Sequence, residues 1–267
     1  MSTSPQPSVL SADLEQLLDR VADRQRSDFG HMASDFKADG TLITACDRWS
    51  DQTLVEGLSR LYPGEGVLSE EGQQAVPASS AYWVVDPLDG TTNFAAGIPY
   101  WAISLARFEQ GRPVLAILDV PPLRQRIVAA VGQGAWRNGK VLQAPSLQAH
   151  PAGCASLCSR SIGVLQKLPD QRFPGKIRML GVASLNLVSV AMGQTVAALE
   201  ATPKIWDLAA AWLVLTELGC SLHWLRSTPE AIAAGTDLAA ADFPLLAADQ
   251  PRTLERFMPW AQALLER

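Results

Sequence analysis

The stretch Y-W-V-V-D-P-L-D-G-T-T-N-F, residues 82–94, decides the fold and the chemistry that we expect of this chain. Four apolar or aromatic residues lead into Asp86, and a second acid, Asp89, follows three positions later. An apolar run that ends in Pro87 and Gly90 is typical of a buried strand that stops in a tight turn. Pro87 fixes its own φ angle, and Gly90 can take a backbone conformation closed to other residues. The sequence therefore predicts two carboxylates held in a turn at a strand end.

A helix is predicted to begin directly after this turn, at Thr91, Thr92 or Asn93. The amides at the start of a helix attract anions because they lack partners within the helix. The negative carboxylates would repel the anion that these amides attract, unless a cation lies between the carboxylates and the anion. We therefore expect a divalent metal ion together with a phosphate group at this turn.

Composition and charge limit the classes of protein to which the chain can belong. Of its 267 residues, 48% are hydrophobic and 18% are charged, as in globular proteins, and the chain is long enough to bury a large core. The net charge of -5 argues against a nucleic acid or an anionic membrane as partner. Residues 1–8 lack the basic and apolar regions of a signal peptide. The four cysteines show no metal-type spacing, so we expect a protein of the reducing cytoplasm.

Asp47 lies between a predicted hairpin and a predicted helix. The stretch F-K-A-D-G-T-L-I-T, residues 36–44, has an Asp-Gly pair between two short strand patterns, which predicts the hairpin. Ser50 or Asp51 can cap the amphipathic helix that follows. Side chains at a strand-to-helix junction often point into clefts, although an exposed carboxylate is the simpler interpretation of Asp47 alone.

Two further acids end predicted strands. Glu70 follows the short strand G-V-L-S, and Glu200 ends the strand T-V-A-A-L-E. Between them, residues 102–141 alternate strand patterns with turn residues, which predicts an antiparallel meander. An apolar helix is expected over residues 184–192.

Asp207 opens the most apolar helix of the chain, D-L-A-A-A-W-L-V-L-T-E-L-G, which we expect to be buried. Asp207 is a natural N-cap and Gly219 a natural C-terminal stop. Plain capping is therefore the alternative to metal binding by Asp207. One more short strand, F-P-L-L-A-A, and a helix over residues 253–265 complete the chain.

Taken together, Glu70, Asp86, Asp89 and Asp207 each fall where a strand ends or a helix starts. Mg²⁺ prefers oxygen ligands, and no set of histidines and cysteines suited to zinc accompanies these acids. Two metal ions that share carboxylates can hold a phosphate, activate a water and stabilise a leaving oxygen.

These motifs resemble the inositol monophosphatase family of lithium-sensitive, magnesium-dependent phosphatases. The resemblance rests on S-E-E-G at 69–72, W-V-V-D-P-L-D-G-T-T-N-F at 83–94 and W-D-L-A-A-A at 206–211, with T-A-C-D at 44–47 and G-Q-G-A-W-R-N-G at 132–139 in support. It extends from about Leu14 to the C-terminal helix. It implies an α/β fold, a layered αβαβα sandwich of the inositol monophosphatase and fructose-1,6-bisphosphatase type. One phosphatase domain would span residues 1–267, with subregions of about 1–145 and 146–267.

The resemblance also implies a set of metal ligands. Glu70, Asp86 and the backbone carbonyl of Leu88 would hold a first Mg²⁺. Asp86, Asp89 and Asp207 would hold a second Mg²⁺ on the side of the leaving group, and Asp86 would bridge the two ions.

Further roles follow from the same resemblance. Asp47 would support a weaker third ion together with Glu70 and through water, which gives two to three ions per site. Thr91 would pair with Asp47 and orient the attacking water, so that Glu70, Thr91 and Asp47 form the catalytic set. The segment Gly90, Thr91 and Thr92 would bind the phosphate.

The substrate side is implied less specifically. Lys37 lies in the hairpin that acts as a flap in relatives. Glu200 and Asp207 match positions that contact the substrate, and a further segment lines its ring: Gly181, Val182 and Ala183. Val182 departs from the hydroxyl residue common there, and Cys220 replaces a usual glycine, which puts a preference for inositol in doubt. Lys204 could reach a second anionic group, although a solvated loop lysine is the simpler interpretation.

The function that we expect is Mg²⁺-dependent hydrolysis of a small phosphate monoester, in the first place inositol monophosphate or a similar polyol or sugar phosphate. Histidinol phosphate, fructose 1,6-bisphosphate and 3′-phosphoadenosine 5′-phosphate are the alternatives within the enzyme class. A regulatory binding protein that keeps the fold is the alternative outside it. The resemblance further implies inhibition by Li⁺ or Ca²⁺ and a homodimer.

Overall fold

The computed structural model describes residues 9–31, 34–36, 42–145, 153–230 and 232–265. Lys37 and the Asp39-Gly40 pair of the expected hairpin lie outside the described residues. The strands on either side of that pair, β1 (Ser34–Phe36) and β2 (Leu42–Thr44), are antiparallel, as a hairpin requires.

A seven-stranded sheet, in the order β3-β4-β5-β6-β7-β8-β9, forms the first half of the molecule. β3 and β4 are parallel, and every other neighbouring pair is antiparallel, which confirms the meander predicted over residues 102–141. The turns at Gln110-Gly111 and Asn138-Gly139 have positive φ angles at both residues, as two-residue hairpin turns need. The strand bounds are β3 Gly66–Ser69, β4 Ala81–Asp89, β5 Ala102–Glu109, β6 Arg112–Val120, β7 Gln125–Ala130, β8 Gly134–Arg137 and β9 Lys140–Val141.

A five-stranded sheet, in the order β11-β10-β12-β14-β13, forms the second half. β10 is parallel to both of its neighbours, whereas β14 is antiparallel to β12 and β13. The strands are β10 Cys154–Leu157, β11 Lys176–Arg178, β12 Ala197–Glu200, β13 Ser221–Trp224 and β14 Leu245–Ala248.

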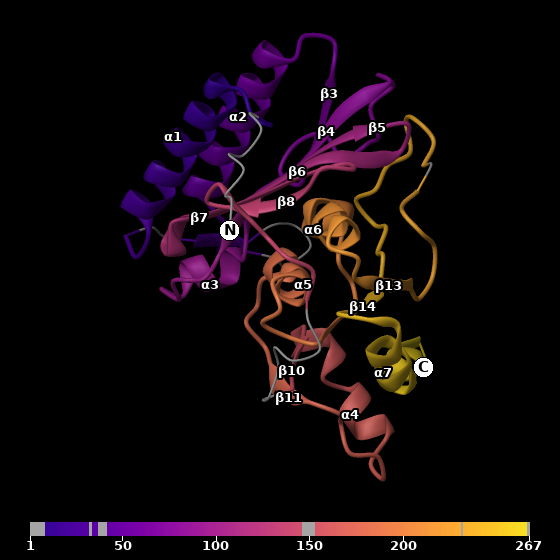
Figure 1. Cartoon of the computed structure of the whole chain (residues 1–267). Coiled ribbons are helices and arrows are strands. Elements are labelled where there is room, and N and C mark those ends of the chain that lie inside the picture. The colour runs from indigo at the N-terminus through magenta and orange to yellow at the C-terminus, as the bar shows by residue number, and fades with distance from the viewer. Residues whose placement is uncertain (1–8, 32–33, 37–41, 146–152, 231, 266–267) are drawn as a thin grey trace.

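Helices cover and separate the two sheets in five layers (Figure 1). α1 and α2 cover the outer face of the first sheet, α5 and α6 fill the space between the sheets, and α4 and α7 cover the outer face of the second. This arrangement confirms the predicted αβαβα sandwich. The helix bounds are α1 Ala12–Asp28, α2 Ala45–Leu61, α3 Thr91–Ala95, α4 Val164–Lys167, α5 Ala183–Ala191, α6 Ile205–Glu217 and α7 Pro251–Leu265, with short 3₁₀ turns η1 Pro121–Leu123 and η2 Ser159–Ser161.

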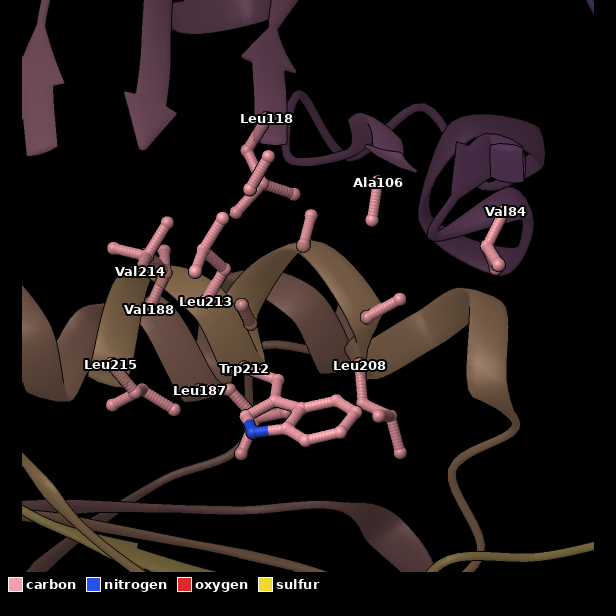
Figure 2. Packing of buried hydrophobic residues seen from close by; sticks show 14 of the residues in the cluster. Val84, Ala106, Leu118, Leu187, Val188, Leu208, Trp212, Leu213, Val214 and Leu215 are labelled. Atoms are coloured by element: carbon pink, nitrogen blue, oxygen red, sulfur yellow. The ribbon is translucent and has the colours of Figure 1, made fainter. Parts of the chain in front are cut away.

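The apolar run at the start of β4 is continuous because both faces of the strand are covered. Trp83 and Val85 pack with the core beneath α1 and α2, whereas Val84 belongs to the core that α5 and α6 share with the sheet. Figure 2 shows Val84 on the strand side facing α6, whose Leu208 and Leu213 lie in the same cluster. The predicted burial of this helix is thereby confirmed, and it fixes the N-terminus of α6 against the end of β4.

The helices that carry Asp47 and Asp207 start at other residues than predicted. α2 begins at Ala45 rather than after Ser50, because Thr44 and Asp47 form a reciprocal capping box: the Thr44 hydroxyl accepts from the Asp47 amide at 3.2 Å, and the Asp47 carboxylate accepts from the Thr44 amide at 2.8 Å. Asp207 is the third residue of α6 and not its N-cap, and its carboxylate reaches back to the Lys204 amide at 2.8 Å.

Strand boundaries also differ. β4 does not stop at Val85 but continues through the acids to Asp89. β13 follows α6 where one strand fewer was expected, and it pairs with β14 at the edge of the second sheet. None of the helices in the described part of the chain combines the length and apolarity that crossing a bilayer requires.

Candidate metal and phosphate site

The site is built at the end of β4, where Asp86 and Asp89 face one cavity. In a regular strand, residues three apart point to opposite faces. The register with β5 shifts between Asp86 and Asp89, which turns both carboxylates to the same side. Oδ1 of Asp86 accepts a hydrogen bond from the Leu88 amide at 2.9 Å, which stabilises the turned backbone.

Gly90 makes the step from β4 to α3 possible. Its φ angle is 104°, in the left-handed region, and a Cβ atom there would lie 2.8 Å from Cγ2 of Val182. Gly181 approaches from the other side of the cavity, and a Cβ on it would lie 3.1 Å from Oδ1 of Asn93. Both glycines therefore let backbone come close to the same cavity.

Glu70 and Asp207 reach the cavity from neighbouring elements. Glu70 directly follows β3, which runs parallel to β4, and its amide donates to the Val85 carbonyl at 3.1 Å. Asp207 comes from the first turn of α6. Carboxylate oxygens of Asp86, Asp89 and Asp207 all lie within 4.8 Å of one another. The cavity of about 180 Å³ is lined by nine residues, all of them predicted site residues: Glu70, Asp86, Leu88, Asp89, Gly90, Thr91, Thr92, Gly181 and Asp207.

Burial, together with the charges of neighbouring acids, raises the pKa values of the three aspartates of the cluster. Burial raises the pKa of Asp86 well above its usual range, and the charges of Glu70, Asp89 and Asp207 raise it further. Burial likewise raises the pKa of Asp207, together with the charges of Asp89 and Glu70. The pKa of Asp89 rises to about 6 through burial, against hydrogen bonds from Ser184 that lower it. Four acids are thus held together at an electrostatic cost.

A divalent metal ion fits this donor set. The donors are oxygens, which Mg²⁺ and Ca²⁺ prefer, and the three aspartates are close enough to share ions. Within the described ranges, no lysine or arginine forms an ion pair with Asp86, Asp89 or Asp207. A bound cation would compensate the buried negative charges and the repulsion between them, which together raise these pKa values.

Asp89 is also held from the second half of the molecule. Its carboxylate accepts from the amides of Ala183 at 3.3 Å and Ser184 at 2.7 Å, at the start of α5. These amides satisfy the carboxylate oxygens and fix the helix relative to β4. The segment predicted to line the substrate is therefore tied directly to the acid cluster.

Thr91 and Asp47 are paired, as expected. Oγ1 of Thr91 donates to Oδ1 of Asp47 at 2.8 Å. Asp47 is buried at 1% exposure, and its other oxygen accepts from the Thr44 amide and hydroxyl. The capping box of α2 thus orients the carboxylate that Thr91 contacts.

A second cavity of about 220 Å³ adjoins the acid cluster and shares Asp89, Gly181 and Asp207 with it. Glu200 lines its floor, at the end of β12, and accepts from Nδ2 of Asn186 at 2.8 Å. Burial raises the pKa of Glu200 to about 8. Val182 and Ala183 also line this cavity, so the segment predicted to contact the substrate and Glu200 lie together.

Several residues of the site escaped sequence reasoning. Asn93 donates through Nδ2 to the carbonyls of Tyr100 at 2.9 Å and Leu180 at 2.7 Å, and so joins α3 to the Gly181 loop. Cys158 and Arg160 line the second cavity. Asn93 lies in the motif itself and could have been found there, whereas no pattern around residues 158–160 marks a site.

Lys204, which could reach a second anionic group by the sequence, is paired within the protein: it forms an ion pair with Asp242 at 3.0 Å.

Comparison with known proteins gives a consistent set of relatives. The model of the inositol monophosphatase family matches residues 10–259. A histidinol-phosphatase of Mycobacterium tuberculosis is 33% identical over 76% of this chain and 82% of its own length. A fructose-1,6-bisphosphatase/inositol-1-monophosphatase of Thermotoga maritima is 29% identical over 67% of this chain and 69% of its own. A Nus factor SuhB of Pseudomonas aeruginosa is 33% identical over 66% of this chain and 70% of its own length.

Solved structures show the same fold. A Thermotoga maritima inositol monophosphatase superposes with a TM-score of 0.79 at 24% identity, over 94% of this chain and 96% of that one. An inositol monophosphatase/NADP phosphatase complexed with Mg²⁺ and phosphate superposes with a TM-score of 0.76 at 23% identity, over 95% of this chain and 94% of that one. A lithium-soaked inhibitory complex of a staphylococcal inositol monophosphatase superposes with a TM-score of 0.75 at 24% identity, over 95% of this chain and 93% of that one.

The match of the family model over nearly the whole chain agrees with the acid cluster and the motifs that form it. The chain belongs to the inositol monophosphatase family.

Proposed function

We propose that this phosphoric monoester hydrolase removes phosphate from a small polyol or sugar phosphate in a Mg²⁺-dependent reaction. The observation that carries the proposal is the triad of Asp86, Asp89 and Asp207, with oxygens within 4.8 Å of one another, beside the Gly90–Thr91 backbone. Acids and helix-start amides in one cavity suit a cation and a phosphate bound together.

Each residue of the cluster has a role in this proposal. Glu70, Asp86 and the Leu88 carbonyl would hold one Mg²⁺, and Asp86, Asp89 and Asp207 would hold a second. Bound Mg²⁺ supplies charge neutralisation and a water of lowered pKa.

The protein's own groups would orient the reactants. The Thr91 hydroxyl donates its hydrogen bond to the Asp47 carboxylate. A lone pair of the hydroxyl oxygen therefore remains to accept a hydrogen bond from the attacking water. Asp47, with Glu70, would support a weaker third ion. The backbone of Gly90, Thr91 and Thr92 would bind the phosphate oxygens.

Inositol monophosphate is our first candidate substrate. Glu200 and the segment Gly181–Ala183 lie in the cavity next to the acids, where the alcohol part of a bound phosphate monoester would extend. The relatives act, by their names, on histidinol phosphate, fructose 1,6-bisphosphate and inositol 1-phosphate, so the first two of these, with 3′-phosphoadenosine 5′-phosphate, are the alternatives.

Release of inorganic phosphate from this panel of four compounds, with Mg²⁺ and with EDTA, tests the proposal. We expect Mg²⁺-dependent release from at least one compound and inhibition by added Li⁺ or Ca²⁺. Release that persists in EDTA, or no release from any compound, would contradict it.

A second candidate function is regulatory binding, which the similarity to a Nus factor SuhB favours. The complete acid cluster argues against a protein that has lost catalysis, but a binding role can exist beside it. A variant with Asp207→Asn separates the two functions, because a purely regulatory protein would keep its cellular role without Mg²⁺-dependent turnover.

We further propose that the chain is one phosphatase unit, acts in the cytoplasm and forms a homodimer. All four cysteines are free, as in a reducing compartment. Ile98, Met179 and Leu180 are exposed at 48%, 41% and 42%. Asn93 brings Ile98 and Leu180 together, because its Nδ2 donates to the Leu180 carbonyl and its own carbonyl accepts from the Ile98 amide. Such an apolar patch suits a subunit contact. Sedimentation of the wild type as a monomer at micromolar concentration would contradict the dimer.

A further inference from the structure

The second cavity is where the alcohol part of a substrate would lie, if the proposed function holds. It shares Asp89, Gly181 and Asp207 with the metal and phosphate cavity, so a phosphate held at the acids would project its ester group there. The chemistry of its remaining lining therefore determines which alcohol is accepted.

Arg160 contributes a positive charge to this lining. It is exposed, and Nη1 donates to Oγ1 of Thr202 at 2.6 Å. Thr202 is neutral, and no ion pair joins Arg160 to an acid anywhere in the described part of the chain. A guanidinium carries five N–H donors in a planar fork, so donors beyond Nη1 remain for a ligand.

Lys204, one residue beyond the cavity lining, shows the contrast. It follows Pro203, which lines the cavity, but its ammonium group is paired with Asp242 at 3.0 Å. Its charge is therefore largely compensated within the protein, whereas that of Arg160 is not.

The backbone that carries Arg160 is held in place. Arg160 lies in η2, between Cys158 and Ser161. The Cys158 amide donates to the Leu199 carbonyl at 3.3 Å, and the Ser161 hydroxyl donates to the same carbonyl at 3.1 Å. In addition, the Ala201 amide donates to Sγ of Cys158 at 3.3 Å. η2 is thus attached to the end of β12, next to Glu200, and the guanidinium starts from a fixed position.

Glu200 lines the same cavity but forms no ion pair with Arg160 in the described part of the chain. It is buried, and Nδ2 of Asn186 donates to one of its oxygens at 2.8 Å. Its carboxyl group suits a substrate hydroxyl, and the guanidinium suits an anion.

We propose that Arg160 binds an anionic substituent, a carboxylate or a second phosphate, on the alcohol part of the substrate. The chain then favours phosphate monoesters that carry such a group, among them fructose 1,6-bisphosphate and 3′-phosphoadenosine 5′-phosphate, and the order of the candidate substrates changes, because inositol monophosphate is the ester of a neutral polyol. This inference rests on the proposed function and narrows it to a class of substrates.

Pairs of substrates that differ only in this group test the proposal. Glycerol 3-phosphate and 3-phosphoglycerate, and glucitol 6-phosphate and 6-phosphogluconate, replace a hydroxymethyl group by a carboxylate at two chain lengths. Fructose 1-phosphate and fructose 1,6-bisphosphate differ by a second phosphate, so the three pairs distinguish the two kinds of anion. Steady-state phosphate release with Mg²⁺ is compared for the wild type, Arg160→Gln, Arg160→Lys and the control Lys204→Gln.

We expect Arg160→Gln to lower kcat/KM for the anionic member of at least one pair about tenfold, through KM, as a charge-assisted hydrogen bond is lost. The neutral members are expected to change less than twofold. Arg160→Lys is expected to recover part of the loss, and Lys204→Gln to leave the ratio within each pair unchanged.

The outcomes separate the inference from the function on which it rests. If Arg160→Gln changes kcat/KM equally for both members of every pair, the role of Arg160 is overturned and the phosphatase activity stands. The same holds if the wild type hydrolyses only the neutral member of each pair. If the wild type releases phosphate with Mg²⁺ from other compounds of the panel of four but from no member of the pairs, the inference is overturned and the proposed function stands. No Mg²⁺-dependent release from the pairs or from the panel of four overturns both.

Discussion

The Thr91 hydroxyl donates to the Asp47 carboxylate at 2.8 Å, across 44 positions of sequence. Asp47 is in turn oriented by the Thr44 amide, so the cap of α2 determines the geometry at the start of α3. A residue that looks like a routine helix cap thereby fixes the hydroxyl that we expect to orient the attacking water.

Thr91→Val tests that role, because valine keeps the shape of threonine without the hydroxyl. We expect kcat to fall roughly a hundredfold or more at saturating Mg²⁺, as for the loss of a group that positions a proton transfer. Thr91→Ser keeps the hydroxyl and should retain most of kcat. Wild-type kcat in the valine variant would remove Thr91 from the mechanism.

Gln25 supports the acid-bearing turn from α1. It is fully buried, its Nε2 donates to the Pro87 carbonyl at 2.7 Å and to Ser50 at 3.2 Å, and its Oε1 accepts from Nε1 of Trp101 at 3.0 Å. Gln25→Leu would leave these buried groups without partners, and we expect it to lower the free energy of unfolding by about 1–3 kcal/mol.

Urea unfolding measures this loss, with Gln52→Leu as the matched control. Gln52 is exposed on α2, and its side chain donates to the exposed side chain of Glu56 at 2.9 Å, so its change should stay within about 0.5 kcal/mol. Equal effects of the two substitutions would show that the buried amide does not stabilise the turn.

The pKa of Glu200 makes the stability of the metal-free protein depend on pH. The value rises from 4.5 to about 8 in the folded state, so the folded protein binds more protons than the unfolded chain between these values. Stability is therefore lost as the pH rises through this window. We expect the wild type to lose about 2.5–3 kcal/mol relative to Glu200→Gln between pH 6 and pH 9.

Urea unfolding of both proteins in EDTA at the two pH values provides the comparison. The difference between wild type and variant isolates Glu200, since the other titrating groups are common to both. A difference that does not change with pH, or one that changes in favour of the wild type, would show that Glu200 ionises freely in the fold.

The layered fold and the acid cluster were predictable because their signals are local. Asp86, Asp89 and Gly90 sit in one turn motif, and the strands and helices around them follow the apolar patterns of their own segments. The helix starts were misplaced by a few residues because the aspartate that caps each helix lies inside it, and its carboxylate accepts from the backbone amide three positions earlier: Asp47 from Thr44 and Asp207 from Lys204.

The features that escaped prediction depend on contacts between distant segments. β13 is a short edge strand that forms by pairing with β14, and its own sequence did not indicate a strand. Arg160 becomes part of a site only because η2 attaches to the end of β12 and so lines the same cavity as Gly181. Likewise, nothing near Gln25 in the sequence indicates that Pro87 and Trp101 are its partners.

The central claim is that the cluster of Asp86, Asp89 and Asp207 binds the Mg²⁺ needed for hydrolysis. The most direct measurement is Mg²⁺-dependent phosphate release by Asp89→Asn beside the wild type, with the exposed Asp170→Asn as control and the panel compound that the wild type turns over best. We expect the Asp89 variant to lose at least a hundredfold in kcat/KM at any Mg²⁺ concentration, while the control keeps wild-type turnover. Wild-type Mg²⁺-dependent turnover in a folded Asp89→Asn protein would contradict the claim.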